Sequence, residues 1–308
     1  MAFADPIGST IAVGRQARIS INGSKFCFAS AEPRSTREIV TNQSATLCGD
    51  IDTAIYRTTP GRQIVGWNVT IDVTWPIVEK VFPLLGNTGG ASGPWSLGAT
   101  DNLTAFPVKL DLVGEVHSMT NCFCSSWELR GQKGSRPVQM SFEFFGETET
   151  AGSFTGTEVA FGAEYAFTQS SMTIEDDADN NQARAFDRFI LAVKNNPVIE
   201  YNNSITMTDA LIGNREAMFA TSVPYVAADK DLYMDHRDST DGRAVVFTLD
   251  NGEKELEFNM PACQPVTKPA SAISKLEQIR TPVTMMLMRD DDSGTRVSPL
   301  TITASTSP

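Results

Sequence analysis

Two stretches of the sequence decide the fold: Arg136-Pro137-Val138-Gln139-Met140-Ser141-Phe142-Glu143-Phe144 and Arg280-Thr281-Pro282-Val283-Thr284-Met285-Met286-Leu287-Met288. Each is a proline followed by a run of residues that favours a β-strand, and each run leads to acidic residues (Glu147 and Glu149 in one, Asp290 to Asp292 in the other). The two prolines lie 145 positions apart in a chain of 308 residues. Similar segments at nearly half the chain length predict an internal duplication.

A second pair of segments supports the same duplication. Residues 69–74 lead into residues 79–82 in the first half, and residues 205–209 lead into residues 216–219 in the second. Both pairs predict a strand followed by a short helix. We therefore expect a mainly β protein with two tandem β-sandwich or barrel units, each with a short flanking helix. Residues 1–150 form the first unit, residues 151–169 a linker or inter-subunit arm, and residues 170–308 the second unit.

The first half has clear signals for strands and one helix. Asn22-Gly23 is a typical hairpin turn, and residues 64–73 alternate between apolar and polar side chains as a strand does. Thr74 is a candidate helix cap before Trp75 and Pro76, and Gly86 is expected to end that helix. Further strands are predicted at residues 106–116, 121–129 and 137–145.

In the second half the strongest signal is Asn251-Gly252, a hairpin turn between predicted strands at residues 243–250 and 253–260. Residues 188–193 fit either a helix or a strand. The remaining elements are predicted as strands at residues 198–201, 204–208 and 279–288, a helix at residues 210–222, and a loop at residues 261–272.

The connecting segment, residues 151–169, is rich in Gly, Ser and Thr, yet it also carries Phe154, Phe161, Tyr165 and Phe167. Flexible Gly/Ser linkers rarely contain aromatic residues. We expect these side chains to pack either on the chain's own core or on a neighbouring subunit.

The charge of the chain argues against a protein that grips DNA. The formal net charge is −12, and residues 1–150 carry 12 basic and 14 acidic residues, so most of the excess acid lies in the second half. Phosphate binding relies on Lys and Arg, which are in the minority here. No apolar run reaches the roughly 18 residues of a membrane helix, and the N-terminus lacks the features of a signal peptide. We expect no membrane association and assembly inside a cell.

No catalytic, cofactor-binding or metal-binding residue is predicted. Asp292-Ser293-Gly294 has the form of an aspartic-protease triplet but has charged neighbours. Asp177, Asp179 and Asn181 resemble the start of a calcium loop, but Gln182 and Arg188 occupy the positions that need Gly and Glu. The two histidines, His117 and His236, have no zinc-ligand spacing. The five cysteines are expected to be reduced thiols: Cys27, Cys48, Cys122, Cys124 and Cys263.

The order of these elements resembles the major tail tube proteins of long-tailed, siphovirus-like bacteriophages. That order is a strand-rich start, a long strand, a short helix, a Gly-rich loop, a hairpin and a Pro-led closing strand. The resemblance extends over about residues 15–150 and 170–300. It implies a β-sandwich or small barrel with one flanking helix, and a hairpin whose copies form a continuous inner barrel. For two fused units it implies trimeric rings with pseudo-sixfold symmetry.

On this reading the chain is a structural protein of the phage tail, not an enzyme, with no cofactor. Its partners would be further copies of itself in stacked rings, and the tape measure, tail terminator and distal tail proteins. DNA would pass through the lumen without specific binding. The protein would be found in the virion after assembly in the host bacterial cytoplasm.

Three alternatives remain open from the residues. The chain could be another virion protein, such as a capsid-decoration or tail-terminator protein. It could be a β-sandwich that binds carbohydrate or acts as an adhesin, with sugars stacked on Trp67, Trp75, Trp95 or Trp127. An enzyme is the third.

For the inner barrel of a tail tube, the candidate segments are residues 64–73, 106–116, 204–208 and 243–260. Glu253, Glu255 and Glu257 would share one face of their strand, and we expect a net acidic lumen that lets DNA pass.

Overall fold

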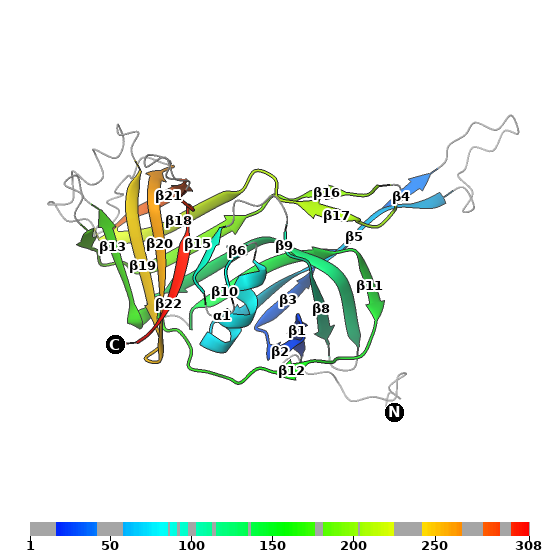
Figure 1. The fold of residues 1–308 in the computed structure, drawn as a ribbon, viewed down its shortest axis with the longest axis horizontal. Helices are drawn as coiled ribbons and strands as arrows, with labels where there is room; N and C mark the ends of the chain where they lie inside the picture. The colour runs from blue at the N-terminus through cyan, green and yellow to red at the C-terminus, as the bar shows by residue number, and fades with distance from the viewer. Residues whose placement is uncertain are drawn as a thin grey trace, which may run out of the picture.

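A computed structural model gives the fold and describes residues 17–41, 58–85, 87–90, 93–97, 103–112, 115–134, 137–175, 181–202, 204–224, 242–266, 280–289 and 297–307. The protein is mainly β (Figure 1). The strands of the first half are β1 (Arg18–Ile21), β2 (Ser24–Cys27), β3 (Ser30–Pro33), β4 (Thr36–Thr41), β5 (Thr58–Asp72), β6 (Asn87–Thr88), β7 (Trp95–Leu97), β8 (Phe106–Asp111), β9 (Val116–Gln132), β10 (Gln139–Gly146), β11 (Thr148–Ala151) and β12 (Thr157–Glu158).

The second half continues with shorter strands. They are β13 (Ser170–Glu175), β14 (Asn181–Ala183), β15 (Arg188–Lys194), β16 (Val198–Glu200), β17 (Asp209–Leu211), β18 (Glu216–Pro224), β19 (Arg243–Asp250), β20 (Lys254–Pro265), β21 (Arg280–Met288) and β22 (Thr301–Thr306). Within the described ranges, the helical segments are α1 (Trp75–Val81) and the 3-10 turns η3 (Phe82–Leu84) and η4 (Phe167–Gln169).

The strands of the first half form two layers around a core. One layer has the order β12-β2-β1-β8-β9-β11, and the other has the order β3-β5-β10-β9. β9 belongs to both layers because residues 116–122 pair with β8 or β11 and the later residues pair with β10. A bulge between Glu143 and Phe144 lets β10 follow this bend. Helix α1 buries Ile77, Val78 and Val81 against the same core.

The second half is built in a similar way. β14, β13, β19 and the first part of β20 form one layer, which β22 and then β7 and β6 extend. β15, β18, β21 and the last part of β20 form the other layer. Aromatic rings fill the space between the layers. Phe247 is fully buried, with ring-centroid distances of 4.3 Å to Phe189, 5.8 Å to Phe219 and 5.6 Å to Phe258.

β9 also joins the two halves. Its free edge pairs with β15 over seven residues, from Gln132↔Arg188 to Ser126↔Lys194. One layer of each half thereby merges into a single sheet with the order β3-β5-β10-β9-β15-β18-β21-β20, called here the joined sheet. Gly131 lies opposite Phe189 in this joint, and a Cβ atom on Gly131 would lie only 2.6 Å from the Cε1 atom of Phe189. A glycine at this position therefore leaves room for the ring.

Several predicted elements agree with the structure. Both Asn-Gly hairpins are present, with Gly23 and Gly252 at positive φ angles of 79° and 81°. The two Pro-led segments are the strands β10 and β21. β10 lies between β5 and β9, and β21 lies between β18 and β20. Residues 188–193, which fitted two alternatives, form strand β15.

Other predictions are wrong. The expected helix at residues 210–222 is replaced by β17 and β18, because β18 pairs on both sides, with β15 and β21. Residues 204–208 form no strand beyond a single bridge at Thr206, and β20 continues through the expected loop as far as Pro265. Thr74 stands at the start of α1, but its side chain makes no capping bond. The segments at residues 64–73 and 106–116 do not pair with each other, since β5 pairs with β3, β4 and β10.

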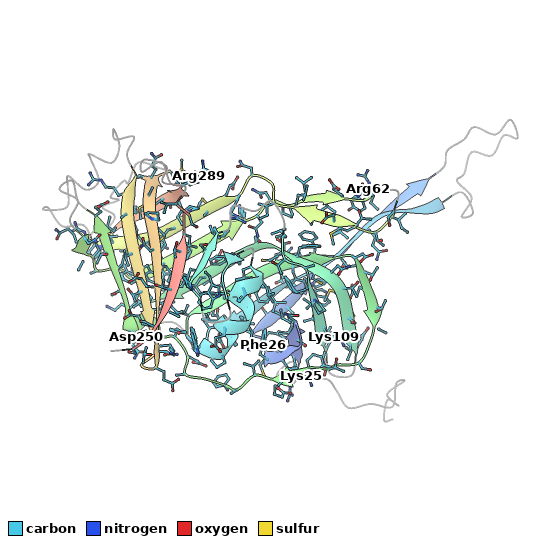
Figure 2. The ribbon with its side chains drawn as sticks, viewed as in Figure 1. Lys25, Phe26, Arg62, Lys109, Asp250 and Arg289 are labelled. Carbon is cyan, nitrogen blue, oxygen red and sulfur yellow. The ribbon has the colours of Figure 1, made fainter. Side chains whose placement is uncertain are left out.

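The arm at residues 151–169 packs on its own chain. Tyr165 and Phe167 are buried in the core. The backbone N–H of Tyr165 donates to the carbonyl oxygen of Val73, and the backbone N–H of Val138 donates to the carbonyl oxygen of Tyr165. Strand β12 extends the edge of β2, and Lys109 Nζ donates to the carbonyl oxygen of Ser153 at 3.1 Å. Lys25 and Lys109 lie on the side of the molecule that the arm crosses (Figure 2). Phe161 remains 79% exposed.

Candidate assembly surface

Among the described residues, no strand pairs with the outer edge of β3, and Gln264 and Pro265 at the end of β20 pair with β21 alone. On β3, Arg34 N donates to Gly66 O, so residues 30, 32 and 34 turn their amides to β5, and Ala31 turns its amide outward. At the other end, Val266 N donates to Thr284 O on β21, while β19 covers β20 only as far as Cys263. A sheet edge of this kind is a template for another strand.

The joined sheet has one face on the core and one open face. On the open face, one row of directly paired residues crosses all eight strands. The row consists of Ser30, Thr70, Ser141, Glu128, Ala192, Met218, Met286 and Gln264. The first half contributes polar side chains to this face, and the second half contributes mostly methionine, alanine and isoleucine. Ile190, Met286 and Met288 are each more than one-third exposed (38%, 37% and 38%).

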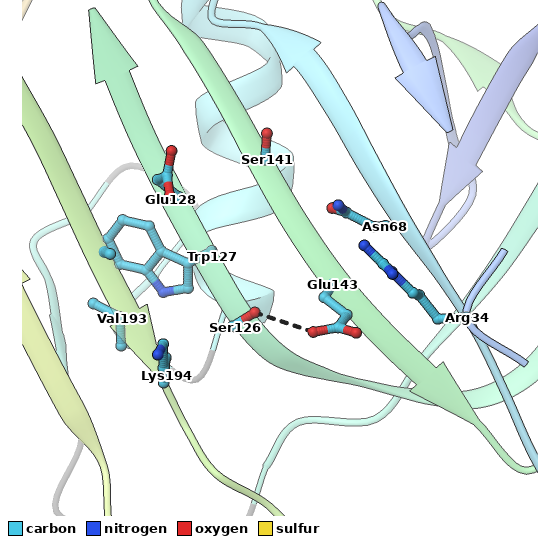
Figure 3. A pocket seen from close by; sticks show the side chains of 10 residues that line it. Arg34, Asn68, Ser126, Trp127, Glu128, Ser141, Glu143, Val193 and Lys194 are labelled. Atoms are coloured by element: carbon cyan, nitrogen blue, oxygen red, sulfur yellow. Dashed lines mark hydrogen bonds between the residues drawn. The ribbon is translucent and has the colours of Figure 1, made fainter. Parts of the chain in front are cut away.

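A shallow depression on this face spans the joint between the halves (Figure 3). It is lined by Arg34, Asn68, Ser126, Trp127, Glu128, Ser141, Glu143, Ala192, Val193 and Lys194. Ser126 Oγ donates to Glu143 Oε2 at 3.4 Å, and Thr70 and Ser141 share a hydrogen bond of 2.8 Å across neighbouring strands. These two bonds join side chains of neighbouring strands, and the charged residues Arg34, Glu128, Glu143 and Lys194 also line the depression.

The charge of the open face is nearly balanced. Among the side chains that the structure describes, its carboxylates are Glu32, Asp72, Glu128, Glu143 and Glu216, and its cations are Arg34, Arg130, Arg188 and Lys194. The acidic residues expected to line a lumen lie elsewhere: Glu255 and Glu257 belong to the first part of β20, which pairs with β19 and β22 in the other layer.

Two hairpins project together from one end of the molecule (Figure 1). They are β4 with the first part of β5, and β16 with β17. Gln63 N donates to Ile205 O at 2.9 Å, and the guanidinium of Arg62 lies 5.0 Å from the ring of Tyr201. A second small core at their base contains Leu103, Phe123, Phe145, Met207 and Ala210. Val198 and Ile205 are about half exposed on this projection (55% and 48%).

The residues considered for catalysis do not come together. His117 Nδ1 lies 2.7 Å from Glu149 Oε1, and its Nε2 lies 3.6 Å from Glu115 Oε1. Among the described residues, no three His, Cys, Asp or Glu side chains are grouped as a metal site requires. Asn181 and Arg188 lie in separate strands, β14 and β15. Asp177, Asp179, His236 and the triplet Asp292-Ser293-Gly294 lie outside the described residues.

The described cysteines are free thiols. Cys122, Cys124 and Cys263 are buried, and Cys27 is exposed, while Cys48 lies outside the described residues. Burial raises the pKa of Cys122 and of Cys263 to about 12, and it raises the pKa of Cys124 as well. Such thiols stay protonated near neutral pH and are poor nucleophiles.

Three of the four tryptophans are buried in the core. Trp67, Trp95 and Trp127 are at most 7% exposed, so their rings have no free face on which a sugar can stack. Trp75 is partly exposed; its ring lies 6.3 Å from that of Trp95 between centroids, and Lys254 Nζ lies 5.6 Å from its centroid.

No protein-family model matches the chain, and no curated protein matches it in sequence. Within the described ranges, no helix has the length and apolar character needed to cross a bilayer. The strand edges and the open face are therefore the features from which a function has to be inferred.

Proposed function

We propose that the protein is a structural virion protein that polymerises as stacked rings and forms the tail tube of a long-tailed bacteriophage, a conduit for DNA during ejection. The observation that carries this proposal is the order of strand pairing. In the first half the pairs are β1–β2, β1–β8, β8–β9, β9–β10, β10–β5, β5–β3 and β9–β11. In the second half they are β13–β14, β13–β19, β19–β20, β20–β21, β21–β18, β18–β15 and β20–β22.

Each of these seven pairs of the first half has a counterpart among the seven pairs of the second half, in the same chain order. The projecting hairpins also correspond, since β4–β5 follows β3 and β16–β17 follows β15. β11 and β22 share sequence as well: Thr148-Glu149-Thr150-Ala151 and Thr301-Ile302-Thr303-Ala304. This correspondence supports two tandem copies of one β unit. Residues 225–241, which connect β18 to β19, lie outside the described residues.

A duplicated unit predicts how copies of the chain associate. Within one chain, the free edge of β9 pairs with β15. The counterparts of these strands are β20 and β3, which end the joined sheet. Repeating the same contact between chains places β20 of one copy beside β3 of the next. Three copies would then supply six similar units, and the ring would close around the open faces of the joined sheets.

The terminal edges differ from the internal joint in one respect. β3 carries Pro33 and β20 carries Pro265, each of which removes an N–H donor from the edge. Prolines on exposed edges limit uncontrolled pairing with other chains. The contact between copies would therefore have fewer backbone bonds than the internal joint. We infer that it depends on the flanking surfaces, which favours assembly from a concentrated or nucleated start.

The open face suits a channel for DNA. The five carboxylates and four cations among its described side chains would give a lumen with little net charge, whereas the sequence predicts a net acidic one. A lumen without a cationic excess would not retain phosphate groups, because retention depends on the release of counterions by Lys and Arg. The apolar side chains contributed by the second half are compatible with passage, since they offer phosphate no partner.

The proposal is tested by electron microscopy of the purified protein and of an Ala31→Pro variant. We expect hollow rings and tubes for the natural sequence. Ala31→Pro removes the outward amide of β3 and should raise the protein concentration needed for tube formation about tenfold while leaving the protomer folded. Ala183→Pro is the matched control, because Ala183 is an exposed alanine whose amide points away from β13 at the edge of β14. Solid shells or persistent monomers from the natural sequence would refute the proposal.

A further inference from the structure

β11 and β22 occupy corresponding places in the two halves, but only one of them has a second neighbour. β22 pairs with β20 on one side and with β7 on the other. β11 pairs with β9 on one side, and no strand of the described residues pairs with its other edge. This difference matters because β7 comes from the first half and lies on a strand of the second half.

The contact between β7 and β22 is a well-packed strand addition. Ile302 lies opposite Trp95, and Leu97 N donates to Leu300 O at 3.2 Å. Ser298 Oγ donates to the carbonyl oxygen of Leu97 at 3.3 Å. The Trp95 side chain is fully buried, with Phe82 at a ring-centroid distance of 5.4 Å. The addition therefore combines backbone bonds with a buried aromatic anchor.

The edge of β11 is prepared for a similar partner. Gly152 N donates to Val116 O at 3.1 Å, so the alternating amides of Glu149 and Ala151 point away from β9. Beside this edge is a cavity of about 440 Å³, lined in part by Gln63, Glu115, His117, Glu149 and Ala151. The hydrogen bond between His117 and Glu149 and a 3.5 Å contact from Ser35 Oγ to Glu149 Oε2 hold the middle of the strand in place.

We propose that the edge of β11 docks the second half of another copy of this chain, just as β22 of the second half docks β7 of the first half within one chain. This inference rests on the proposed ring. Within one chain, the first half contacts the second half through β9–β15 and through β7–β22. If the second half of one copy contacts the first half of the next in the same way, β20–β3 replaces β9–β15, and a contact on β11 replaces β7–β22. Both contacts then belong to one interface.

Hydrogen exchange of assembled and unassembled protein separates this inference from the proposed function. On assembly we expect the hydrogen-exchange rates of the outward amides of Glu149 and Ala151 to fall at least about tenfold, which is the effect of one added hydrogen bond. The amide of Ala31 should slow similarly through the β3 contact. Slowing at Ala31 alone would overturn the docking on β11 and keep the ring. Slowing at β11 alone would refute the β20–β3 contact and keep the docking. No slowing at either edge would refute both.

An Ala151→Pro variant tests the edge directly, with Ala183→Pro as the matched control. We expect Ala151→Pro to raise the protein concentration needed for assembly about tenfold, because it deletes one outward amide, and Ala183→Pro to leave it nearly unchanged. Wild-type assembly of a folded Ala151→Pro protein would overturn the proposal.

A cross-linking variant identifies the partner and remains informative if Ala151→Pro does not fold. Thr150→Cys, with Cys27→Ser and Cys48→Ser, is labelled with a thiol-reactive benzophenone and irradiated after assembly. Adducts to the second half of another copy are expected. Adducts confined to the same chain, or to the first half of another copy, would overturn the proposal.

Discussion

Replacing Gly131 with alanine is the sharpest test of how the two halves are joined. Gly131 lies in β9 opposite Phe189 in β15. An added Cβ atom would lie 2.6 Å from Phe189 Cε1, 3.0 Å from Phe189 Cζ and 3.3 Å from Val138 Cγ2. The Phe189 ring cannot simply turn away, because it is fully buried and packs against Phe247 at 4.3 Å and Phe167 at 6.2 Å between ring centroids.

The expected loss of stability follows from two opposing effects. Overpacking a buried site typically costs about 1–3 kcal/mol. Replacing glycine with alanine also reduces the entropy of the unfolded chain, which offsets about 0.4–1 kcal/mol. We therefore expect Gly131→Ala to lower the free energy of unfolding by about 1–2 kcal/mol. In the double variant with Phe189→Leu, the smaller side chain makes room for the methyl group, so the two losses should not add, with a coupling of about 1 kcal/mol.

Urea denaturation of the wild type, both single variants and the double variant measures this coupling. Gly90→Ala is the control, because a Cβ atom on Gly90 would have no neighbour within 4 Å, and it should change stability by less than about 0.5 kcal/mol. Wild-type stability of Gly131→Ala, or strictly additive losses in the double variant, would refute the packing described for the joint.

Four further predictions concern the turn, the thiols and DNA. Gly252→Ala should lower the free energy of unfolding by about 1–2 kcal/mol, because Gly252 has a φ angle of 81°; an unchanged denaturation midpoint would contradict the turn geometry. Iodoacetamide at pH 8 should modify Cys27 in the folded protein and spare Cys122, Cys124 and Cys263, as peptide mass spectrometry can check. Stability should fall as the pH rises above 9, since unfolded thiols lose protons near their ordinary pKa of 9.0 while burial raises the pKa of Cys122 and Cys263 to about 12; a flat profile from pH 8 to 11 would contradict this. Assembled tubes should show no salt-sensitive retention of double-stranded DNA in a gel-shift assay, and a complex that dissociates steeply with salt would contradict the channel charge described above.

The sequence predicted elements whose signals are local. Both Asn-Gly turns were found because a two-residue hairpin needs residues that accept positive φ angles. The strands β10 and β21 were found from their prolines and β-favouring runs. The long strand within β5 and the position of helix α1 were also clear from their periodicity.

The sequence misled where neighbours decide the structure. Residues 210–222 were expected to be helical, but β18 lies between β15 and β21, and pairing on both edges outweighs a weak local preference. The joint between β9 and β15 could not be predicted, because it links residues about 60 positions apart. The main sequence feature of the joint is a single glycine, Gly131, opposite Phe189. The similarity of Thr148–Ala151 to residues 301–304 is only four residues long and gains meaning from the matching positions of β11 and β22.

The candidate assembly surface was only partly accessible from the sequence. An acidic face on residues 253–260 was expected to line a lumen. Its alternation is present, with Leu256 and Phe258 buried, but these residues pair with β19 and β22 rather than lying on the open face of the joined sheet. The alternation of apolar and polar residues shows which side chains of a strand are buried. It does not show which layer the strand joins, because that depends on its pairing with distant strands.

We propose that copies of this chain close a ring by repeating the β9–β15 contact between β20 and β3. An electron cryo-microscopy reconstruction of the assembled protein would resolve this contact. We expect three chains per ring, a hollow channel lined by the open faces of the joined sheets, and β20 of each chain beside β3 of the next. A ring in which the edges of β3 and β20 face solvent, or an assembly without a channel, would contradict it.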